Sequence, residues 1–399
     1  MRLLYVAGGH PVQEADDCLM WQKLGIDWFS TGYYAQSKQP GLLPRIDHTN
    51  CPRLTRLLKN CRGDINEADQ PHTILGQKNR DFTRYSIPNI WKFTPEFLSN
   101  FDIIMFNHHV QNIKNNWGTI YRLNPSPPMI IKTFGMHSIA DEKAIKEYRQ
   151  HACGMLFSVR TGNTEANGFS ENVYAGYDAV IRGSVLTDEH EVSGWIGDKK
   201  EVVTFTNTIN YHGVLEQKRR DIYVQCRKLS TYPFRLFGAG NADEILSEGL
   251  VSHSQKLQIL RNARIALTTG TPNANTTYSF VEAWVMGIPQ IVYGPQLWGG
   301  ACYEPNLLGK HEDDIIIAET PHDIAKYIHK IMIDDDFAQQ LSTNSRTKAL
   351  KIYSRAMLAQ QWKVFLDNIT NLPYKSCQPK PVVQQTTKQI HTINRKQRS

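Results

Sequence analysis

A helix start rich in hydroxyl side chains is followed one turn later by a carboxylate. Thr276, Thr277 and Ser279 precede an apolar helical pattern, where they can cap the helix while its free N–H groups point outward. Such a helix N-terminus binds phosphate well. Glu282 follows, placed so that its carboxylate can accept two hydrogen bonds from a ribose diol, and Gly287 ends the helix. The pattern predicts a nucleotide site, the alternative being an ordinary helix with a solvated glutamate.

Three consecutive cations, Lys218, Arg219 and Arg220, begin another predicted helix. A cation at a helix N-terminus opposes the helix dipole, which favours an anion-binding role over a solvated basic helix start. A fixed cation would stabilise the charge that develops on a departing diphosphate. We expect Lys218 and Arg219 to take this part.

Glycine and histidine follow three predicted strands in the N-terminal half. Gly8 and Gly9 form a turn in which backbone can approach a ligand, whereas His108, His109 and His137 come directly after later strands. Ligands collect beyond the carboxyl ends of strands in α/β sheets. A histidine there could take a proton from an acceptor hydroxyl or bind the donor sugar, although loop histidines are commonly structural.

The acidic and thiol residues do not predict a metal. No Asp-x-Asp pair follows a predicted strand at the ligand-binding edge, and we interpret Asp313, Asp314 and the run 334–336 as surface acids. The seven cysteines are odd in number and contain no C-x-x-C, so neither a disulfide framework nor a zinc site is indicated. We expect no required metal, no cofactor and a cytoplasmic location.

The net charge of +7 comes almost entirely from the C-terminal tail. Residues 373–399 carry six basic residues and no acid, so the body is nearly neutral and does not resemble a nucleic-acid-binding protein. The tail has little to bury, which predicts disorder, with contact to an anionic surface as the functional alternative. No stretch approaches the roughly 20 apolar residues of a transmembrane helix, and no signal peptide is recognisable.

Strand and helix patterns alternate along most of the chain, which predicts an α/β fold with doubly wound parallel sheets. Helical patterns cover 140–151, 218–229, 254–263, 335–353 and 355–369. The predicted strands are short apolar runs that suit burial between helices. They span 3–6, 103–106, 129–133, 155–159, 179–182, 202–205, 234–237, 265–268, 290–293 and 315–317.

The length fits two domains, with a glycine-containing linker near 191–202. The region 35–95 has no clear pattern. We expect an N-terminal acceptor domain over 1–195, a C-terminal donor domain over 196–354, a C-terminal helix over 355–372 that can pack back on the N-terminal domain, and the tail over 373–399.

Several segments in correct order resemble the donor domain of retaining GT-B glycosyltransferases, the group called family 4. The resemblance covers roughly 200–370 and is only topological before that. It implies two Rossmann-like domains facing a cleft. The matching segments are FRLFGAGN at 234–241, VSHSQKL at 251–257, RNARIALT at 261–268, the helix and strand at 275–294, YEP at 303–305, PHDIA at 321–325 and Trp362.

The resemblance assigns roles to individual positions. Glu282 matches the glutamate that holds the donor ribose, but the preceding family glutamate falls at Ala274. Backbone N–H groups of Thr276, Thr277 and Tyr278 match the diphosphate-binding positions. The departure at Ala274 leaves both retention and inversion open.

Four further positions match the family. Gly238, Gly240 and Val251 correspond to the slot for the nucleotide base, and His137 to a frequent family histidine. Asn207 stands where the family commonly has an arginine that binds diphosphate, which leaves this role to the basic run after it.

The resemblance implies a metal-independent glycosyltransferase, with hexosyl transfer and retention as the family pattern. The donor would be a nucleotide-sugar, and the acceptor a glycan, a lipid-linked glycan, a protein or a modified DNA base. A nucleotide-sugar epimerase and a non-catalytic nucleotide-sugar-binding protein remain alternatives, because fold alone does not decide function.

Overall fold

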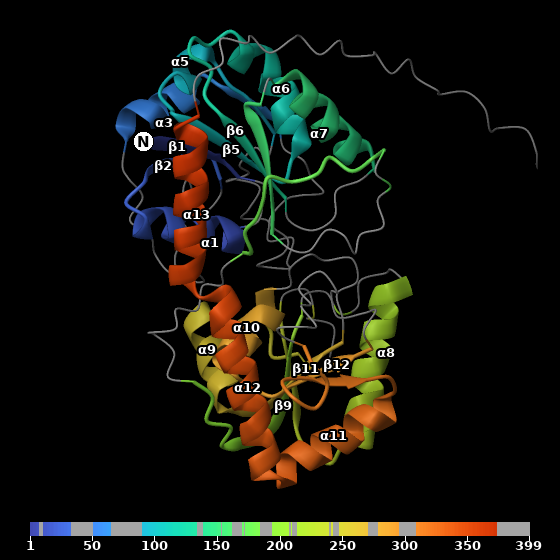
Figure 1. Ribbon diagram of the computed structural model, residues 1–399. Helices are drawn as coiled ribbons and strands as arrows, with labels where there is room; N and C mark the ends of the chain where they lie inside the picture. Colours follow the sequence, from blue (N-terminus) through green and yellow to red (C-terminus); the bar gives the residue numbers. More distant parts are fainter. Residues whose placement is uncertain are drawn as a thin grey trace, which may run out of the picture.

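The computed structural model contains two parallel β-sheets, and helices cover both faces of each sheet (Figure 1). None of the described helices is both long and apolar enough to cross a membrane. The structure describes residues 1–7, 11–32, 51–64, 90–133, 139–152, 154–161, 170, 172–183, 194–206, 209, 214–238, 241, 247–269, 278–294 and 309–372.

The first sheet belongs to the N-terminal part of the chain, which we call the N-terminal lobe. All its neighbouring strands pair in parallel. In spatial order they are β2 (Asp27–Ser30), β1 (Arg2–Val6), β5 (Ile103–Asn107), β6 (Met129–Thr133), β7 (Leu156–Arg160) and β8 (Ala179–Val180).

In the described part of this lobe, five helices and a small antiparallel hairpin accompany the sheet. The hairpin consists of β3 (Arg62–Asp64) and β4 (Ile90–Lys92). The helices are α1 (Pro11–Lys23), α3 (Pro52–Leu58), α5 (Pro95–Leu98), α6 (Val110–Tyr121) and α7 (Ile139–His151).

The second sheet defines the C-terminal lobe and is also entirely parallel. Its strands, in spatial order, are β10 (Phe234–Phe237), β9 (Lys199–Phe205), β11 (Ala263–Thr268), β12 (Gln290–Tyr293) and β13 (Ile316–Ala318). The helices after the first sheet are α8 (Val214–Leu229), α9 (His253–Asn262), α10 (Tyr278–Met286), α11 (Pro321–Ile333), α12 (Asp335–Tyr353) and α13 (Arg355–Thr370).

The predicted fold class of doubly wound parallel sheets is confirmed. Each of the ten predicted strands is present, although several bounds move by one to three residues. Strand β2 and the hairpin β3–β4 were not predicted. The structure also corrects the start of α8, which begins at Val214 rather than at Lys218.

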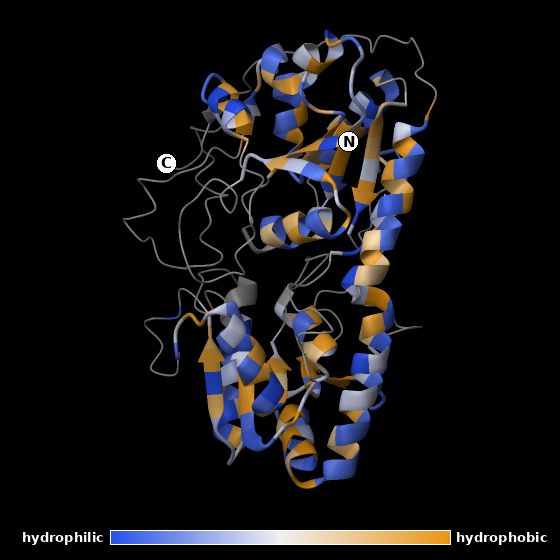
Figure 2. Cartoon of the chain, turned by 90° about the vertical axis from the view of Figure 1, so that its left-hand side faces the viewer, coloured by the Kyte–Doolittle hydropathy of each residue, from blue (hydrophilic) through white to orange (hydrophobic). Residues whose placement is uncertain are grey.

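Burial on both faces explains why the strands are apolar runs rather than alternating patterns. In β1, Leu3 and Tyr5 face one core while Leu4 and Val6 face another, and all four side chains are fully buried. Figure 2 shows the same concentration of apolar residues along the strands of both sheets.

The last helix, α13, begins beside the C-terminal lobe and packs on the N-terminal sheet. Trp362 contacts Trp21 of α1 edge-on, with ring centroids 5.0 Å apart. Leu366 and Ile369 enter the same buried cluster as Leu3 of β1. Helices α12 and α13 therefore form a column along one side of the molecule that joins the two lobes (Figure 1).

Gly287 ends α10 as its sequence position predicted. It adopts a φ of +82°, and its N–H bonds to the carbonyls of Ala283 and Trp284. A side chain here would also meet α12, because an added Cβ would come within 3.0 Å of the Arg346 Cβ. The glycine thus permits both the left-handed turn and the close approach of α12.

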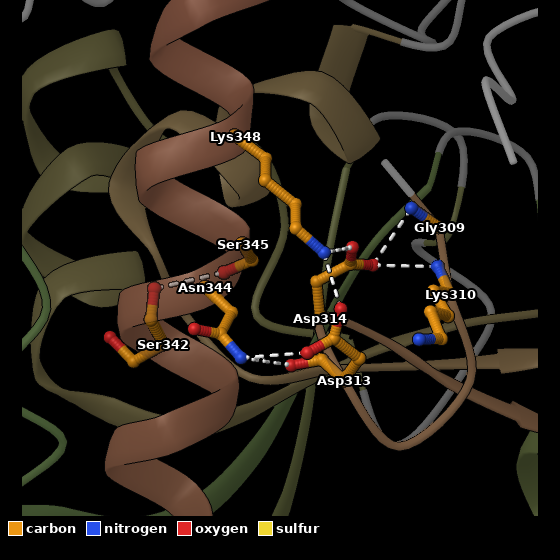
Figure 3. A network of polar contacts seen from close by, with 8 residues as sticks. All are labelled: Gly309, Lys310, Asp313, Asp314, Ser342, Asn344, Ser345 and Lys348. Atoms are coloured by element: carbon orange, nitrogen blue, oxygen red, sulfur yellow. Dashed lines mark hydrogen bonds and ion pairs between the residues drawn. The ribbon is translucent and has the colours of Figure 1, made fainter. Parts of the chain in front are cut away.

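The interpretation of Asp314 as a surface acid is wrong. Its carboxylate is fully buried, accepts hydrogen bonds from the N–H groups of Gly309 at 2.7 Å and Lys310 at 2.9 Å, and pairs with Lys348 at 2.8 Å (Figure 3). Asp313 is partly exposed and also binds Lys348, and this hydrogen bond lowers the pKa of Asp313. Its contribution to stability is therefore lost as the pH falls through that lowered pKa.

The acidic run 334–336 starts α12. Asp334 caps the helix by accepting a hydrogen bond from the Phe337 N–H at 2.9 Å. Asp335 and Asp336 are exposed in the first turn, where the helix dipole favours negative charge.

We expect Asp314→Ala to lower the free energy of unfolding by about 2–4 kcal/mol, because the buried Gly309 N–H and the part-buried Lys310 N–H lose their acceptor and each unsatisfied buried group costs about 1–3 kcal/mol. Chemical denaturation of both proteins measures this difference. Asp336→Ala is the matched control and should cost no more than about 1 kcal/mol. Equal effects of the two substitutions would contradict a structural role for Asp314.

Candidate functional site

The carboxyl ends of two neighbouring strands meet the start of α10 in the C-terminal lobe. Strand β9 ends at Phe205 and β10 ends at Phe237, and these two residues are paired in register. The Ser279 hydroxyl, in the first turn of α10, donates to the Phe205 carbonyl at 3.4 Å. The helix that carries Glu282 is thus attached directly to the end of β9.

Glu282 is almost fully buried, with 3% of its side chain exposed. One carboxylate oxygen, Oε2, forms an ion pair with Lys256 of α9. The other oxygen, Oε1, lies 3.8 Å from Nδ1 of His253, which is beyond hydrogen-bond distance. Two helices that are separate in sequence therefore place a carboxylate, an ammonium group and an imidazole together.

Two aromatic rings line the Lys256 side of this group. The rings of Phe205 and Phe237 stack with centroids 5.0 Å apart and an interplanar angle of 18°. The Lys256 ammonium lies 5.1 Å from the centroid of Phe205, and the Arg235 guanidinium 4.9 Å from that of Phe237. Both distances permit a cation–π attraction, which helps to fix the position of Lys256.

Asn241 joins the loops that follow β9 and β10. Its buried side-chain amide donates to the carbonyls of Thr206 at 2.8 Å and Gly238 at 3.2 Å. Its oxygen accepts from the Ile209 N–H at 2.8 Å. Gly238 adopts a φ of +131°, which a residue with a side chain rarely does.

The start of α9 is fixed by a complete capping box. Ser252 accepts from the Gln255 N–H at 3.3 Å, while the Gln255 side chain accepts from the Ser252 N–H at 2.9 Å. Val251 precedes the cap and packs on the cluster that contains Phe237. This cap sets the first turn of α9, from which His253 and Lys256 project toward Glu282.

Six predicted site residues lie outside the part of the chain that the structure describes. The six are Gly8, Gly9, His137, Gly240, Thr276 and Thr277. For two others only the backbone is described: Tyr278 is the first residue of α10, and Lys218 lies in the second turn of α8.

Arg219 is 8% exposed and lies within α8 rather than at its start. Because the helix begins at Val214, the basic run occupies its second turn. The helix dipole acts mainly on charges in the first turn. It therefore disfavours these cations less than the sequence indicated, and it gives a weaker reason to expect an anion site here.

His108 and His109 follow β5 at the corresponding edge of the N-terminal sheet. His108 has a φ of +67°, which is uncommon outside glycine, and His109 is the N-cap of α6. Their ring centroids lie 5.7 Å apart. Just before them, the buried side chains of Asn107 and Gln13 bond to each other at 3.4 Å.

Buried ion pairs support this edge of the N-terminal sheet. Lys132 of β6 pairs with Asp17 of α1, and the Tyr5 hydroxyl donates to the same carboxylate at 2.7 Å. Burial and the Asp17 charge raise the pKa of Tyr5 well above its usual value, so its hydroxyl remains a donor. Arg160 of β7 binds Glu142 of α7 through both carboxylate oxygens, at 2.7 and 2.9 Å.

Among the described residues, no group of three or more His, Cys, Asp or Glu side chains is arranged to hold a metal ion.

The sequence matches no protein-family model, and no curated protein is similar to it. Solved structures do match. A sucrose-phosphate synthase from Thermosynechococcus elongatus aligns over 92% of this chain and 98% of its own, with a TM-score of 0.59 and 12% identity. Anabaena HepE in complex with UDP-glucose aligns over 92% of this chain and 100% of its own, with a TM-score of 0.57 and 12% identity. The chain has the GT-B fold.

The structure of TarM from S. aureus matches less well, with a TM-score of 0.48 and 14% identity over 67% of this chain. The match includes 55% of TarM, so the present chain spans about half of that protein.

Sequence patterns in the C-terminal lobe pointed to Glu282 but missed its partners. Lys256 and His253 lie on a different helix, and Asn241 contacts only backbone groups. One signal was available for Lys256. It is a cation in the first turns of a helix whose N-cap is readable from Ser252 and Gln255, and a cation is unfavourable there without an anionic partner.

We expect Asn241→Asp to lower the free energy of unfolding by about 2–4 kcal/mol at about pH 8, because a buried carboxylate would face two carbonyl oxygens without a donor. Burial should raise the folded-state pKa of the introduced carboxyl group. The penalty should therefore be smaller at about pH 5, where protonation restores one donor.

Denaturant titration at both pH values tests this expectation. Asn60→Asp, in an exposed turn, serves as the control and should show little change at either pH. A penalty for Asn241→Asp that does not depend on pH would contradict the assigned hydrogen bonds.

Proposed function

We propose that this protein transfers a sugar from a nucleotide-sugar donor to an acceptor hydroxyl group. The observation that carries the proposal is the position of Glu282. Its carboxylate lies on the helix that follows β11, attached to the carboxyl end of β9, where α/β sheets bind ligands. The GT-B fold supplies the setting, and the site supplies the chemistry.

The proposed donor is a UDP-hexose. HepE, which shares the fold across almost the whole chain, was solved with UDP-glucose. In our proposal Glu282 binds the donor ribose, the N–H groups of Thr276, Thr277 and Tyr278 bind the diphosphate, and Gly238, Gly240 and Val251 border the base. The family-4 pattern of the sequence supports this assignment.

In the proposed reaction, the bond between the anomeric carbon and the diphosphate oxygen breaks, and the acceptor oxygen bonds to that carbon. The nucleoside diphosphate leaves with additional negative charge, which Lys218 and Arg219 would stabilise without a metal. His137 is the proposed group near the reacting hydroxyl, and it would accept the proton that this hydroxyl loses when its oxygen bonds to the anomeric carbon. Retention of the anomeric configuration is part of the proposal and follows from the family-4 resemblance.

The acceptor is proposed to bind at the N-terminal sheet, near the ends of β1 and β5. A surface glycan, a lipid-linked glycan, a protein or a modified DNA base would each supply a hydroxyl group. The six cations of 373–399 would favour an acceptor on an anionic surface, because such a tail raises the local concentration of the protein there.

One observation favours a second candidate. Ala274 stands where the family has a carboxylate for the donor sugar. A protein that binds a nucleotide-sugar without transferring it would tolerate this loss. An epimerase, which needs carboxylates around the sugar, is disfavoured by the same residue. Incubation with a panel of radiolabelled donors separates transfer, isomerisation and binding alone.

We expect Glu282→Gln to weaken the binding of UDP by about ten- to hundredfold, because hydrogen bonds to a charged group contribute about 1.5–3 kcal/mol. Calorimetry with UDP, GDP, ADP and CDP identifies the base and measures the loss. Glu319→Gln, an exposed change of the same kind, should bind like the wild type. Unchanged affinity in a folded Glu282→Gln protein would contradict the ribose assignment.

We expect sugar transfer to persist in excess EDTA. Either Lys218→Met or Arg219→Met should lower the rate by about 10²–10³, as removal of one preorganised electrostatic group does. Thermal unfolding of each variant controls for loss of structure. Loss of transfer in EDTA that Mg²⁺ or Mn²⁺ restores would show that a metal carries the diphosphate charge.

A further inference from the structure

The Lys256 ammonium group has donor capacity beyond its contact with Glu282. Among the described residues, it contacts the Glu282 Oε2 oxygen and the face of the Phe205 ring. An ammonium group has three donors, and one carboxylate oxygen uses one of them. Lys256 remains 19% exposed, so the remaining capacity is available to a ligand.

Within the described part of the chain, Glu282 has complementary capacity. Its Oε1 oxygen lies 3.8 Å from His253 Nδ1, too far for a hydrogen bond, whereas Oε2 is used by Lys256. A hydrogen-bond donor and a hydrogen-bond acceptor with opposite charges therefore stand side by side. Two neighbouring hydroxyl groups can use both at once, because one can donate to the carboxylate while the other accepts from the ammonium group.

Resting on the function proposed above, we propose that Lys256 is the second half of the ribose site. One hydroxyl of the donor's ribose diol donates to Glu282, and the other accepts from Lys256. Lys256 is thus a specificity-determining residue, because a nucleotide that lacks either hydroxyl leaves one charged partner unsatisfied.

Electrostatics favours this pairing over a lone glutamate. A nucleoside diphosphate carries several negative charges, and a buried carboxylate without a counter-charge would repel it. The ion pair with Lys256 places a compensating positive charge beside this carboxylate. Removing Lys256 would therefore weaken binding in two ways, by loss of a hydrogen bond and by loss of the compensating charge.

The aromatic pair beneath Lys256 prepares it for this role. The Phe205 ring holds the ammonium group at 5.1 Å, and Phe237 stacks behind Phe205. Lysine loses considerable side-chain entropy when it is ordered, and here much of that loss precedes ligand binding. If Lys256 instead blocked Glu282 and competed with the ribose, removal of Lys256 would strengthen the binding of UDP.

The experiment compares UDP with 2′-deoxy-UDP and 3′-deoxy-UDP by calorimetry in wild type, Lys256→Met and Glu282→Gln. Should the nucleotide panel rank GDP, ADP or CDP above UDP, the deoxy forms of that diphosphate replace those of UDP. We expect the wild type to bind each deoxy form about tenfold or more weakly, the scale of a hydrogen bond to a charged group. Lys256→Met should lose most of its discrimination against one deoxy form and keep it against the other.

Glu282→Gln should reduce the discrimination that Lys256→Met keeps. Lys351→Met, an exposed change on α12, is the matched control and should bind like the wild type. If Lys256→Met fails to fold because it leaves Glu282 uncompensated, the double variant Lys256→Met/Glu282→Gln removes both charges. That variant should discriminate against neither deoxy form.

Three outcomes overturn the inference while the proposed function stands. The first is equal affinity of the wild type for UDP and both deoxy forms. The second is undiminished discrimination between UDP and both deoxy forms in Lys256→Met or in the double variant. The third is tighter binding of UDP by Lys256→Met, which would show that Lys256 competes with the ribose. A wild-type protein that binds no nucleoside diphosphate would instead contradict the proposed function itself.

Discussion

Parallel pairing of every strand in the two main sheets is the constraint on which the site depends. Parallel strands all end at the same edge, so the segments that follow them must begin together. Residues far apart in sequence meet there for this reason. The contact from Ser279 to Phe205 and the amide bridges of Asn241 then fix how the segments at this edge lie.

The buried ion pairs differ in how many of their carboxylate oxygens accept a hydrogen bond. Glu142 is satisfied by Arg160 through both oxygens, and its Oε2 also accepts from a backbone N–H. Asp314 likewise uses both oxygens, one on backbone N–H groups and one on Lys348. Glu282 has Oε2 on Lys256, and its Oε1 lies 3.8 Å from Nδ1 of His253, beyond hydrogen-bond distance. The first two pairs hold the chain in place, whereas the third retains capacity for a ligand.

The sequence predicted the elements whose buried residues form continuous apolar runs. Strand β2 contains Asp27 and Ser30, and the hairpin strands are only three residues long, so local pattern did not identify them. The sequence pointed to Glu282 because hydroxyl residues precede its helical pattern and a glycine ends it. Its pairing with Lys256 spans 26 residues and depends on how two helices pack, which no local pattern contains. Asp314 was misjudged because backbone N–H groups are the donors that satisfy its carboxylate, and such groups leave no pattern in the sequence.

The contribution of α13 to the N-terminal core has a consequence for the order in which the nascent chain can fold. A ribosome releases β1 first and α13 among the last elements, yet Leu3 and Trp21 share a cluster with Trp362 and Leu366. Until α13 emerges, the part of this apolar cluster that α13 covers stays exposed, and of the described helices only α1 packs on that face of the sheet. Such a face is prone to aggregation while it is exposed. The N-terminal lobe therefore completes its core only after the C-terminal lobe has been translated, which makes this packing a late, long-range event.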